Sequence, residues 1–218
     1  MEAVRNPGRE RVLARIRKAL SETAPKYAPS PASAPAFAPV TVPLERFQRE
    51  CALNGTECIL TPDSNASAAV VAEVLASIPP GEIFVQDAPA LRSLAGRWTQ
   101  NHSLYWSTQG PPAEDSQATI TCAEALVAQT GSVFVSSACG GRGASIVAPV
   151  HIVVATIDQL LPGLDDAWKR LRETGAAARN SMLCLITGSS RTADIEKIIV
   201  MGAHGPRRLV VVLSTSSA

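Results

Sequence analysis

The stretch Leu183-Cys-Leu-Ile-Thr-Gly-Ser-Ser-Arg-Thr-Ala-Asp-Ile-Glu196 decides the predicted fold. Its first four residues form a short apolar run, which is typical of a buried strand. Residues 187–190 form a turn of small and hydroxyl-bearing residues, and the apolar residues of 193–199 return at helical spacing. Ser190 or Thr192 can serve as the N-cap of that helix, with acidic residues in its first turn. The stretch therefore predicts a strand, a turn and a helix.

A turn between a strand and a helix leaves backbone N–H groups free at the positive end of the helix dipole. Such a turn can bind an anion, and Arg191 adds a forked cation beside it. We therefore predict that Thr187, Gly188, Ser190 and Arg191 bind an anionic group. An ordinary turn with a capped helix and no ligand explains the same residues.

The composition limits the classes of protein. The chain has 218 residues, a formal net charge of +1 and 46% hydrophobic residues, enough for one core with an appendage. Near-zero charge argues against a dedicated nucleic-acid binder. No apolar run approaches the ~18 residues that cross a bilayer, and the basic N-terminus lacks the apolar segment of a signal peptide.

The cysteines are five in number and scattered, without a Cys-x-x-Cys motif. This spacing supports neither a disulfide framework nor an iron–sulfur cluster held by this chain alone. A reducing cytoplasm is the simplest compartment for such a chain. The cysteines and histidines are not at metal-ligand spacing either, so we predict no zinc site.

The chain divides into three parts. Residues 1–22 predict a basic amphipathic helix, 23–43 an Ala/Pro-rich extended linker, and 44–218 an α/β domain. The helix places Val12, Leu13, Ile16 and Leu20 on one face. Its basic face suits an anionic partner or a membrane surface, and a solvated face is the alternative.

Strand-like and helix-like segments alternate after the linker, which predicts βαβ units and a three-layer, mainly parallel sheet. The helix at 164–173 is expected to turn Leu164, Ala167, Trp168 and Leu171 inward. The centre departs from the alternation: we expect a helical turn at 123–126 and two strands that meet at Thr130-Gly131. The expected helices are 44–53, 64–77, 89–98 and 164–173, and the expected strands of the sheet are 57–60, 83–85, 104–106, 120–122, 150–155 and 209–213.

Three further residues are candidates for chemistry. Arg142 lies in a Gly-rich loop and can clamp a carboxylate, although an exposed loop arginine is an equal alternative. His151 lies inside an apolar strand, which favours a hydrogen-bonded core histidine. His204, between two glycines, is the best general acid–base candidate among the histidines, and turn packing is its alternative.

Several blocks taken together resemble the lactate utilization protein C family, the single-domain LUD proteins. Their order and spacing between about Thr119 and Val212 are specific, whereas the first half of the chain matches only in architecture. The blocks are Arg11–Leu20, Ala128–Ser132, Ser136–Ser137, Arg142, Pro149–Val154, Ile186–Glu196 and Gly202–Pro206.

The resemblance implies a fold similar to the ribose-phosphate isomerase, glucosamine-phosphate deaminase and coenzyme A transferase domains. It also implies a part in oxidising L-lactate to pyruvate beside two partner proteins, which carry the iron–sulfur clusters while this chain binds none. A small carboxylate or another anion is the expected ligand, with Thr130, Gly131 and Ser136 added to the predicted binding residues.

The chain departs from the family at Gln129, where relatives usually have Glu, and at Ser132, where they have a second Thr. A glutamine forms hydrogen bonds but cannot act as a carboxylate base or nucleophile, which argues against acyl-transfer chemistry. Two alternatives stay open: a stand-alone enzyme acting on a sugar phosphate or acyl-coenzyme A, and a non-catalytic interaction subunit that docks through its basic helix.

Overall fold

A computed structural model describes residues 7–21, 38–98, 101–193, 199–201 and 205–216, with the backbone alone described at 191–193 and 199–201. Contacts divide the chain into Met1–Ala38 and Pro39–Ala218. The described part of the first unit is helix α1 (Pro7–Ser21), which has no buried residue. No described helix is long and apolar enough to cross a membrane.

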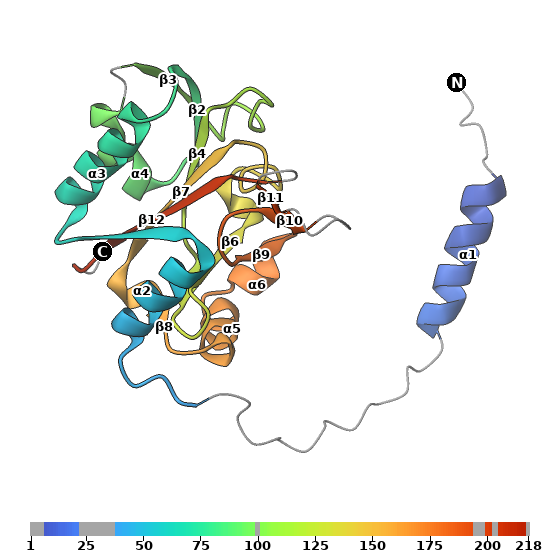
Figure 1. Cartoon of the computed structure of the whole chain (residues 1–218). Coiled ribbons are helices and arrows are strands. Elements are labelled where there is room, and N and C mark those ends of the chain that lie inside the picture. The colour runs from blue at the N-terminus through green and yellow to red at the C-terminus, as the bar shows by residue number, and fades with distance from the viewer. Residues whose placement is uncertain (1–6, 22–37, 99–100, 194–198, 202–204, 217–218) are drawn as a thin grey trace. The chain divides into compact units, whose positions relative to one another are not determined.

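The second unit is built on a six-stranded sheet in which every pair of neighbours is parallel (Figure 1). The middle strands are mostly apolar and almost entirely buried, as expected for a sheet that is covered on both faces. This confirms the predicted α/β class and the parallel sheet. Its strands, in spatial order, are β1 (Thr56–Thr61), β12 (Arg208–Ser214), β7 (Val150–Thr156), β4 (Ala118–Cys122), β2 (Gly81–Val85) and β3 (His102–Trp106).

Helices α3 (Ser64–Ala76) and α4 (Pro89–Leu94), with the 3₁₀ turn η1 (Ala95–Arg97), pack on one face of this sheet. The Asp63 carboxylate caps α3 by accepting from the Ala66 N–H at 2.9 Å. The buried Trp98 closes the layer by donating its indole N–H to the Ala68 carbonyl oxygen at 3.1 Å.

The opposite face is covered by α2 (Pro43–Asn54) and by a second sheet of four strands. That sheet has the order β8 (Leu160–Leu161), β5 (Ala125–Val127), β6 (Ser132–Ser136) and β9 (Leu183–Ile186). Helices α5 (Leu164–Glu173) and α6 (Ala176–Arg179) pack on its outer face (Figure 1). The hairpin β5–β6 turns at Thr130-Gly131, as predicted.

The helix predicted after Ser190 is wrong. Arg191–Ala193 (β10) and Ile199–Met201 (β11) are instead two short antiparallel strands. β-Branched residues at Thr192, Ile199 and Val200 favour extended backbone, and pairing between the two segments satisfies their hydrogen bonds. The turn at 187–190 therefore does not lead into a helix N-terminus, and no helix dipole reinforces an anion site there.

Three local predictions also need correction. A helical turn was predicted at 123–126, but its last two residues, 125 and 126, belong to strand β5, which pairs with β6 and β8. Strand β9 was expected to be buried, but it is the edge strand of the small sheet and Leu185 is 40% exposed. Trp168 is 37% exposed rather than turned inward, and its ring packs in a T-shaped arrangement with Phe134, with the ring centroids 5.3 Å apart.

Candidate functional site

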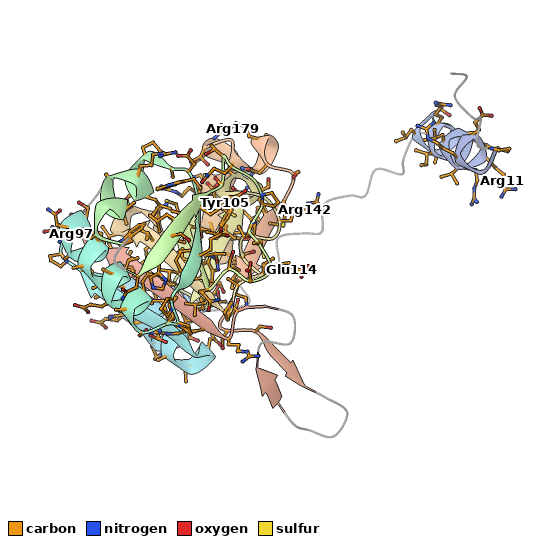
Figure 2. All side chains as sticks on the ribbon, turned by 90° about the horizontal axis from the view of Figure 1, so that it is seen from above. Arg11, Arg97, Tyr105, Glu114, Arg142 and Arg179 are labelled. Atoms are coloured by element: carbon orange, nitrogen blue, oxygen red, sulfur yellow. The ribbon has the colours of Figure 1, made fainter. Side chains whose placement is uncertain are left out.

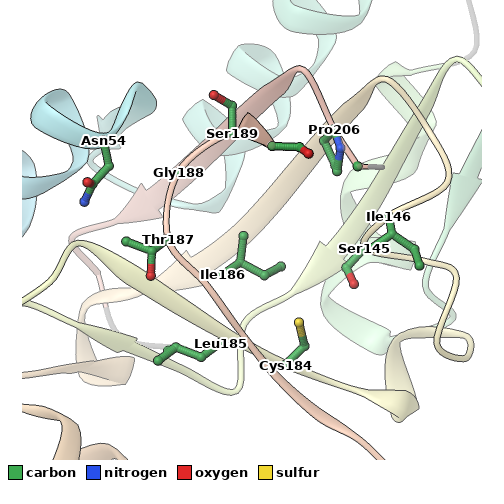
Figure 3. Close-up of a pocket in the computed structure, with 12 residues that line it drawn as sticks. Asn54, Ser145, Ile146, Cys184, Leu185, Ile186, Thr187, Gly188, Ser189 and Pro206 are labelled. Atoms are coloured by element: carbon green, nitrogen blue, oxygen red, sulfur yellow. The ribbon is translucent and has the colours of Figure 1, made fainter. Parts of the chain in front are cut away.

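A pocket of about 440 Å³ lies where the end of β9 meets the segments that precede β7 and β12 (Figure 3). We call it the turn pocket, because the turn at 187–190 forms one wall. Residues 145 and 146 form the opposite wall, and Pro206 lies between the two walls. Its lining residues are Asn54, Ser145, Ile146, Cys184, Leu185, Ile186, Thr187, Gly188, Ser189, Ser190, Gly205 and Pro206.

Two glycine turns pack against the last turn of α2 and fix the position of this wall. Gly188 has φ +79°, and a Cβ built there would lie 2.3 Å from the carbonyl oxygen of Asn54. Gly131 has φ +63°, and its Cβ would lie 2.7 Å from the backbone nitrogen of Cys51. Both positions therefore require glycine. The amide of Asn54 also donates to the Thr130 carbonyl oxygen at 2.9 Å.

A chain of hydroxyl groups joins the two turns. Thr130 Oγ1 and Ser132 Oγ are 2.6 Å apart, and Ser132 Oγ is 2.6 Å from Thr187 Oγ1. Ser132 is fully buried, whereas Thr187 is exposed and lines the pocket. The fold thus brings together five of the predicted binding residues, namely Thr130, Gly131, Thr187, Gly188 and Ser190.

Ser145 adds a polar group that the sequence did not indicate. Its side chain lines the turn pocket, the residue is 2% exposed, and its hydroxyl has no nitrogen or oxygen partner among the described residues. It lies beside the Cys184 thiol: burial raises the pKa of that thiol, and the Ser145 contact opposes the shift. Sulfur is a weak acceptor, so the buried hydroxyl keeps hydrogen-bonding capacity for a ligand.

The other predicted residues are not gathered here. Ser136 lies at the far end of β6, where its hydroxyl donates to Glu124 Oε1 at 2.5 Å and accepts from the Ala138 N–H. Arg142 is exposed in its loop (Figure 2) and does not line the turn pocket. The side chain of Arg191 and the whole of His204 lie outside the described residues.

Gln129 does not line the turn pocket either. Its N–H donates to the Pro162 carbonyl oxygen at 3.0 Å, and its own carbonyl accepts from Arg46 Nη2 at 3.3 Å. The side-chain oxygen lies beside Gly163, at the N-terminus of α5: a Cβ on Gly163 would be 3.7 Å from it. Gln129 is therefore placed beside the start of α5 and away from the turn pocket.

His151 is a core residue, as its sequence context favoured. The side chain is fully buried, and Nε2 is 2.9 Å from Thr121 Oγ1. Burial lowers the pKa of His151 to about 4, so the ring is neutral near pH 7. Within the described part of the chain, no group of three His, Cys, Asp or Glu side chains could hold a metal ion.

Comparison with known proteins assigns the fold to a family. Residues 110–214 match the model of the LUD domain, so this part of the chain is an LUD domain. The crystal structure of a DUF162 family protein from Deinococcus radiodurans superposes with a TM-score of 0.60. That alignment has 21% identity and covers 79% of this chain and 96% of the other, so it supports the fold alone.

Three similar proteins carry the name lactate utilization protein C. Lactate utilization protein C of Geobacillus sp. is 26% identical over 79% of this chain and 78% of its own length. The protein of that name from Bacillus subtilis is 26% identical over 76% of this chain and 75% of its own. The one from Halalkalibacterium halodurans reaches 32% identity, over 44% of this chain and 43% of its own.

Proposed function

We propose that the chain is a component of a lactate-utilization system and that it binds a small carboxylate, with L-lactate as the first candidate, in the turn pocket. The involvement in lactate utilization is supported by relatives named lactate utilization protein C, two of which align along about three quarters of both chains. Ser145 is the observation that carries the ligand site, because a buried hydroxyl without an oxygen or nitrogen partner is costly unless something binds to it.

The pocket chemistry suits a hydroxy acid. Hydroxyl groups of Ser145, Thr187 and Ser190 line it together with the apolar side chains of Ile146 and Ile186. Hydroxyls can donate to a carboxylate and accept from an alcohol, while the apolar residues can contact a methyl group. No described cationic side chain lines the pocket. We therefore assign ligand binding to neutral hydrogen bonds from Ser145, Thr187 and Ser190. A cationic side chain that clamps the carboxylate is not part of this assignment.

Oxidation of lactate to pyruvate removes a pair of electrons and two protons, and these electrons need an acceptor. We assign that acceptor to iron–sulfur clusters in partner proteins, with this chain presenting the substrate. Helix α1 is a suitable docking element for such a partner. Val12, Ile16 and Leu20 are 54%, 48% and 80% exposed on a helix that also carries five basic residues.

Two measurements on the full chain test this proposal. Calorimetric titration with L-lactate should show saturable binding that Ser145→Ala weakens, by roughly threefold to tenfold for one lost neutral hydrogen bond. The matched control is Ser93→Ala, since Ser93 is exposed on α4 and its hydroxyl donates to the Ala90 carbonyl oxygen. Equal affinity of wild type and Ser145→Ala would exclude Ser145 as a ligand-binding residue.

The system itself is tested by affinity purification of the tagged full chain from its native cells. A brown eluate that reduces a dye with L-lactate, and loses that activity on deletion of residues 1–22, is expected. A colourless eluate without lactate-dependent reduction would contradict the role in lactate oxidation. In that case phosphate and coenzyme A are the next ligands to titrate, because the stand-alone enzyme is the second candidate.

A further inference from the structure

A second pocket lies on the face of the parallel sheet that α3 and α4 cover, whereas the turn pocket lies beside α2 and the small sheet. We call it the α3 notch, because the last turns of α3 form one wall, and the turn η1 with the start of β3 forms the other. Its volume is about 70 Å³, and the two pockets share no lining residue. The notch is lined by the apolar residues Ala72, Leu75, Ala76 and Trp98 and by the polar residues Arg97, Asn101 and His102.

His102 supplies a buried acceptor in the notch. The residue is 9% exposed, and its Nε2 is 3.0 Å from the Leu75 carbonyl oxygen. A carbonyl oxygen only accepts hydrogen bonds, so Nε2 carries the ring proton, and Nδ1 of the neutral ring keeps its lone pair. That Nδ1 is buried and has no partner among the described residues. Because a buried polar atom without a partner is costly, Nδ1 indicates a ligand that donates a hydrogen bond.

Arg97 supplies a cation at the mouth of the notch. The residue is exposed (Figure 2), and its side chain has no ion pair or hydrogen bond with a described residue. Arg92, five positions earlier, is instead held by two bonds to the Asp87 carboxylate. A free guanidinium can bind a carboxylate through two parallel N–H bonds. The indole N–H of Trp98 is taken by the Ala68 carbonyl oxygen, so Trp98 offers the notch a carbon surface.

We propose that the α3 notch binds a small 2-hydroxycarboxylate, whose carboxylate lies on Arg97 and whose hydroxyl donates to His102 Nδ1. Arg97 and His102 line the same small cavity, so the two groups of the ligand must be close together. They are close when the hydroxyl is on the carbon next to the carboxylate. The volume of the notch compares with about 30 Å³ for one water molecule in the liquid, which limits the ligand to a few carbons. A methyl group on that carbon packs against Leu75 and Trp98.

The same polar groups disfavour related ligands. A metal ion or an amine finds no carboxylate side chain in the lining of the notch. A simple carboxylate can bind Arg97 but has no proton for His102 Nδ1, which then stays unpaired. A 2-oxo acid has the charge and nearly the size of the hydroxy acid, but it presents an acceptor oxygen to the acceptor Nδ1. The notch therefore selects the hydroxy acid over its oxo acid.

Nitrogen NMR of the full chain, isotopically labelled at its histidines, observes this site directly. Added L-lactate should shift the Nδ1 resonance of His102 along a saturable curve, because a new hydrogen bond to that nitrogen changes its chemical shift. Pyruvate should need a concentration roughly threefold to tenfold higher for half of the shift, since it lacks one neutral hydrogen bond. The variant His102→Gln assigns the resonance, because it removes one of the three histidines.

Two charge variants locate the carboxylate. Arg97→Gln should weaken the binding of L-lactate observed at His102 by roughly tenfold or more, because one charge-assisted pair is lost. Arg172→Gln is the matched control, since Arg172 is exposed on α5 and does not line the notch. It should leave the His102 curve unchanged. Circular dichroism of both variants should match that of the wild type, because both arginines are exposed.

The proposal is overturned if L-lactate gives no saturable shift at His102, or if L-lactate and pyruvate have equal midpoints. It is equally overturned if Arg97→Gln has the same midpoint as Arg172→Gln. These readouts are separate from the turn pocket, because Ser145 does not line the notch, and Ser145→Ala should leave the His102 curve unchanged. Calorimetry of Arg97→Gln conversely measures L-lactate binding in the turn pocket alone. Failure at one site is thereby distinguished from failure at the other.

Discussion

The side-chain amide of Asn54 and the carbonyl oxygen of Thr130 are joined by a hydrogen bond of 2.9 Å. The contact ties the last turn of α2 to a hairpin turn 76 residues further along the chain. Gly188 packs on the carbonyl of the same Asn54. One residue at the end of one helix therefore holds both turns that shape the wall of the turn pocket.

Replacing Asn54 with alanine should loosen this junction. The variant leaves the partly buried Thr130 carbonyl without its amide donor, and we expect the free energy of unfolding to fall by about 1–3 kcal/mol. Urea denaturation of both proteins measures the difference. Leu53→Ala is the matched control, because Leu53 precedes Asn54 in α2 and is 69% exposed. An equal loss in the two variants would mean that the bond to Thr130 contributes nothing.

Gly188→Ala should destabilise the same wall from the opposite side. The residue has φ +79°, and the added Cβ would meet the Asn54 carbonyl oxygen at 2.3 Å, so backbone must shift. We expect a loss of about 1–3 kcal/mol or more in the free energy of unfolding, with weaker L-lactate binding.

Gly96→Ala is the comparison for that substitution. Nothing lies within 4 Å of a Cβ at Gly96, in the 3₁₀ turn η1. There we expect no loss, or a gain of about 0.4–1 kcal/mol from the restricted unfolded chain. Thermal unfolding of the two variants side by side should separate them clearly. Similar stability of both would show that the packing of Gly188 on α2 is dispensable.

Gln129→Glu, which introduces a carboxylate at this position, should not raise activity. The Gln129 side chain lies beside Gly163, at the start of α5, rather than in the turn pocket. Lactate-dependent dye reduction by the purified complex should therefore be unchanged. A clear increase with Gln129→Glu would instead place a catalytic carboxylate at this position, and the proposed role of the turn pocket would need revision.

The sequence predicted the parallel sheet because its signals are local. Ile152–Ala155 and Leu209–Leu213 are unbroken apolar runs, and α3 combines a helical apolar face with a terminating Pro-Pro-Gly. The second sheet depends on pairing between distant short segments. Strand β5 has three residues, and its pairing with β8 joins positions more than 30 residues apart, which no periodicity records.

The candidate site was predicted in part for the same reason. Thr130 and Thr187 stood in recognisable turns, but only the antiparallel pairing of β6 with β9 brings those turns to the two sides of Ser132. Ser145 carried no signal, because a serine after a glycine-rich loop is unremarkable until the fold buries it. The error at residues 191–201 had another cause. Ile, Val and Thr there fit a helical spacing and a pair of short strands equally well.

His151 should make the stability of the domain fall steeply in mild acid. Its pKa is about 4 in the folded protein, against about 6.5 for an exposed histidine. Between these values the unfolded chain binds a proton that the folded protein does not, so the free energy of unfolding falls as the pH falls. From pH 7 to pH 5 this difference amounts to about 2 kcal/mol.

The variant His151→Gln has no titratable group at this position, so its unfolded chain does not take up that proton. The glutamine amide can still form a hydrogen bond with Thr121. Urea unfolding at pH 7 and pH 5 should therefore show a loss about 2 kcal/mol smaller in the variant than in the wild type. The depressed pKa of Glu57, which is paired with Arg208, adds an acid-sensitive loss of the same sign that both proteins share. Equal losses would mean that the folded protein also protonates His151. Its Nδ1, which has no partner among the described residues, would then have to donate to a group that enters the core, such as water.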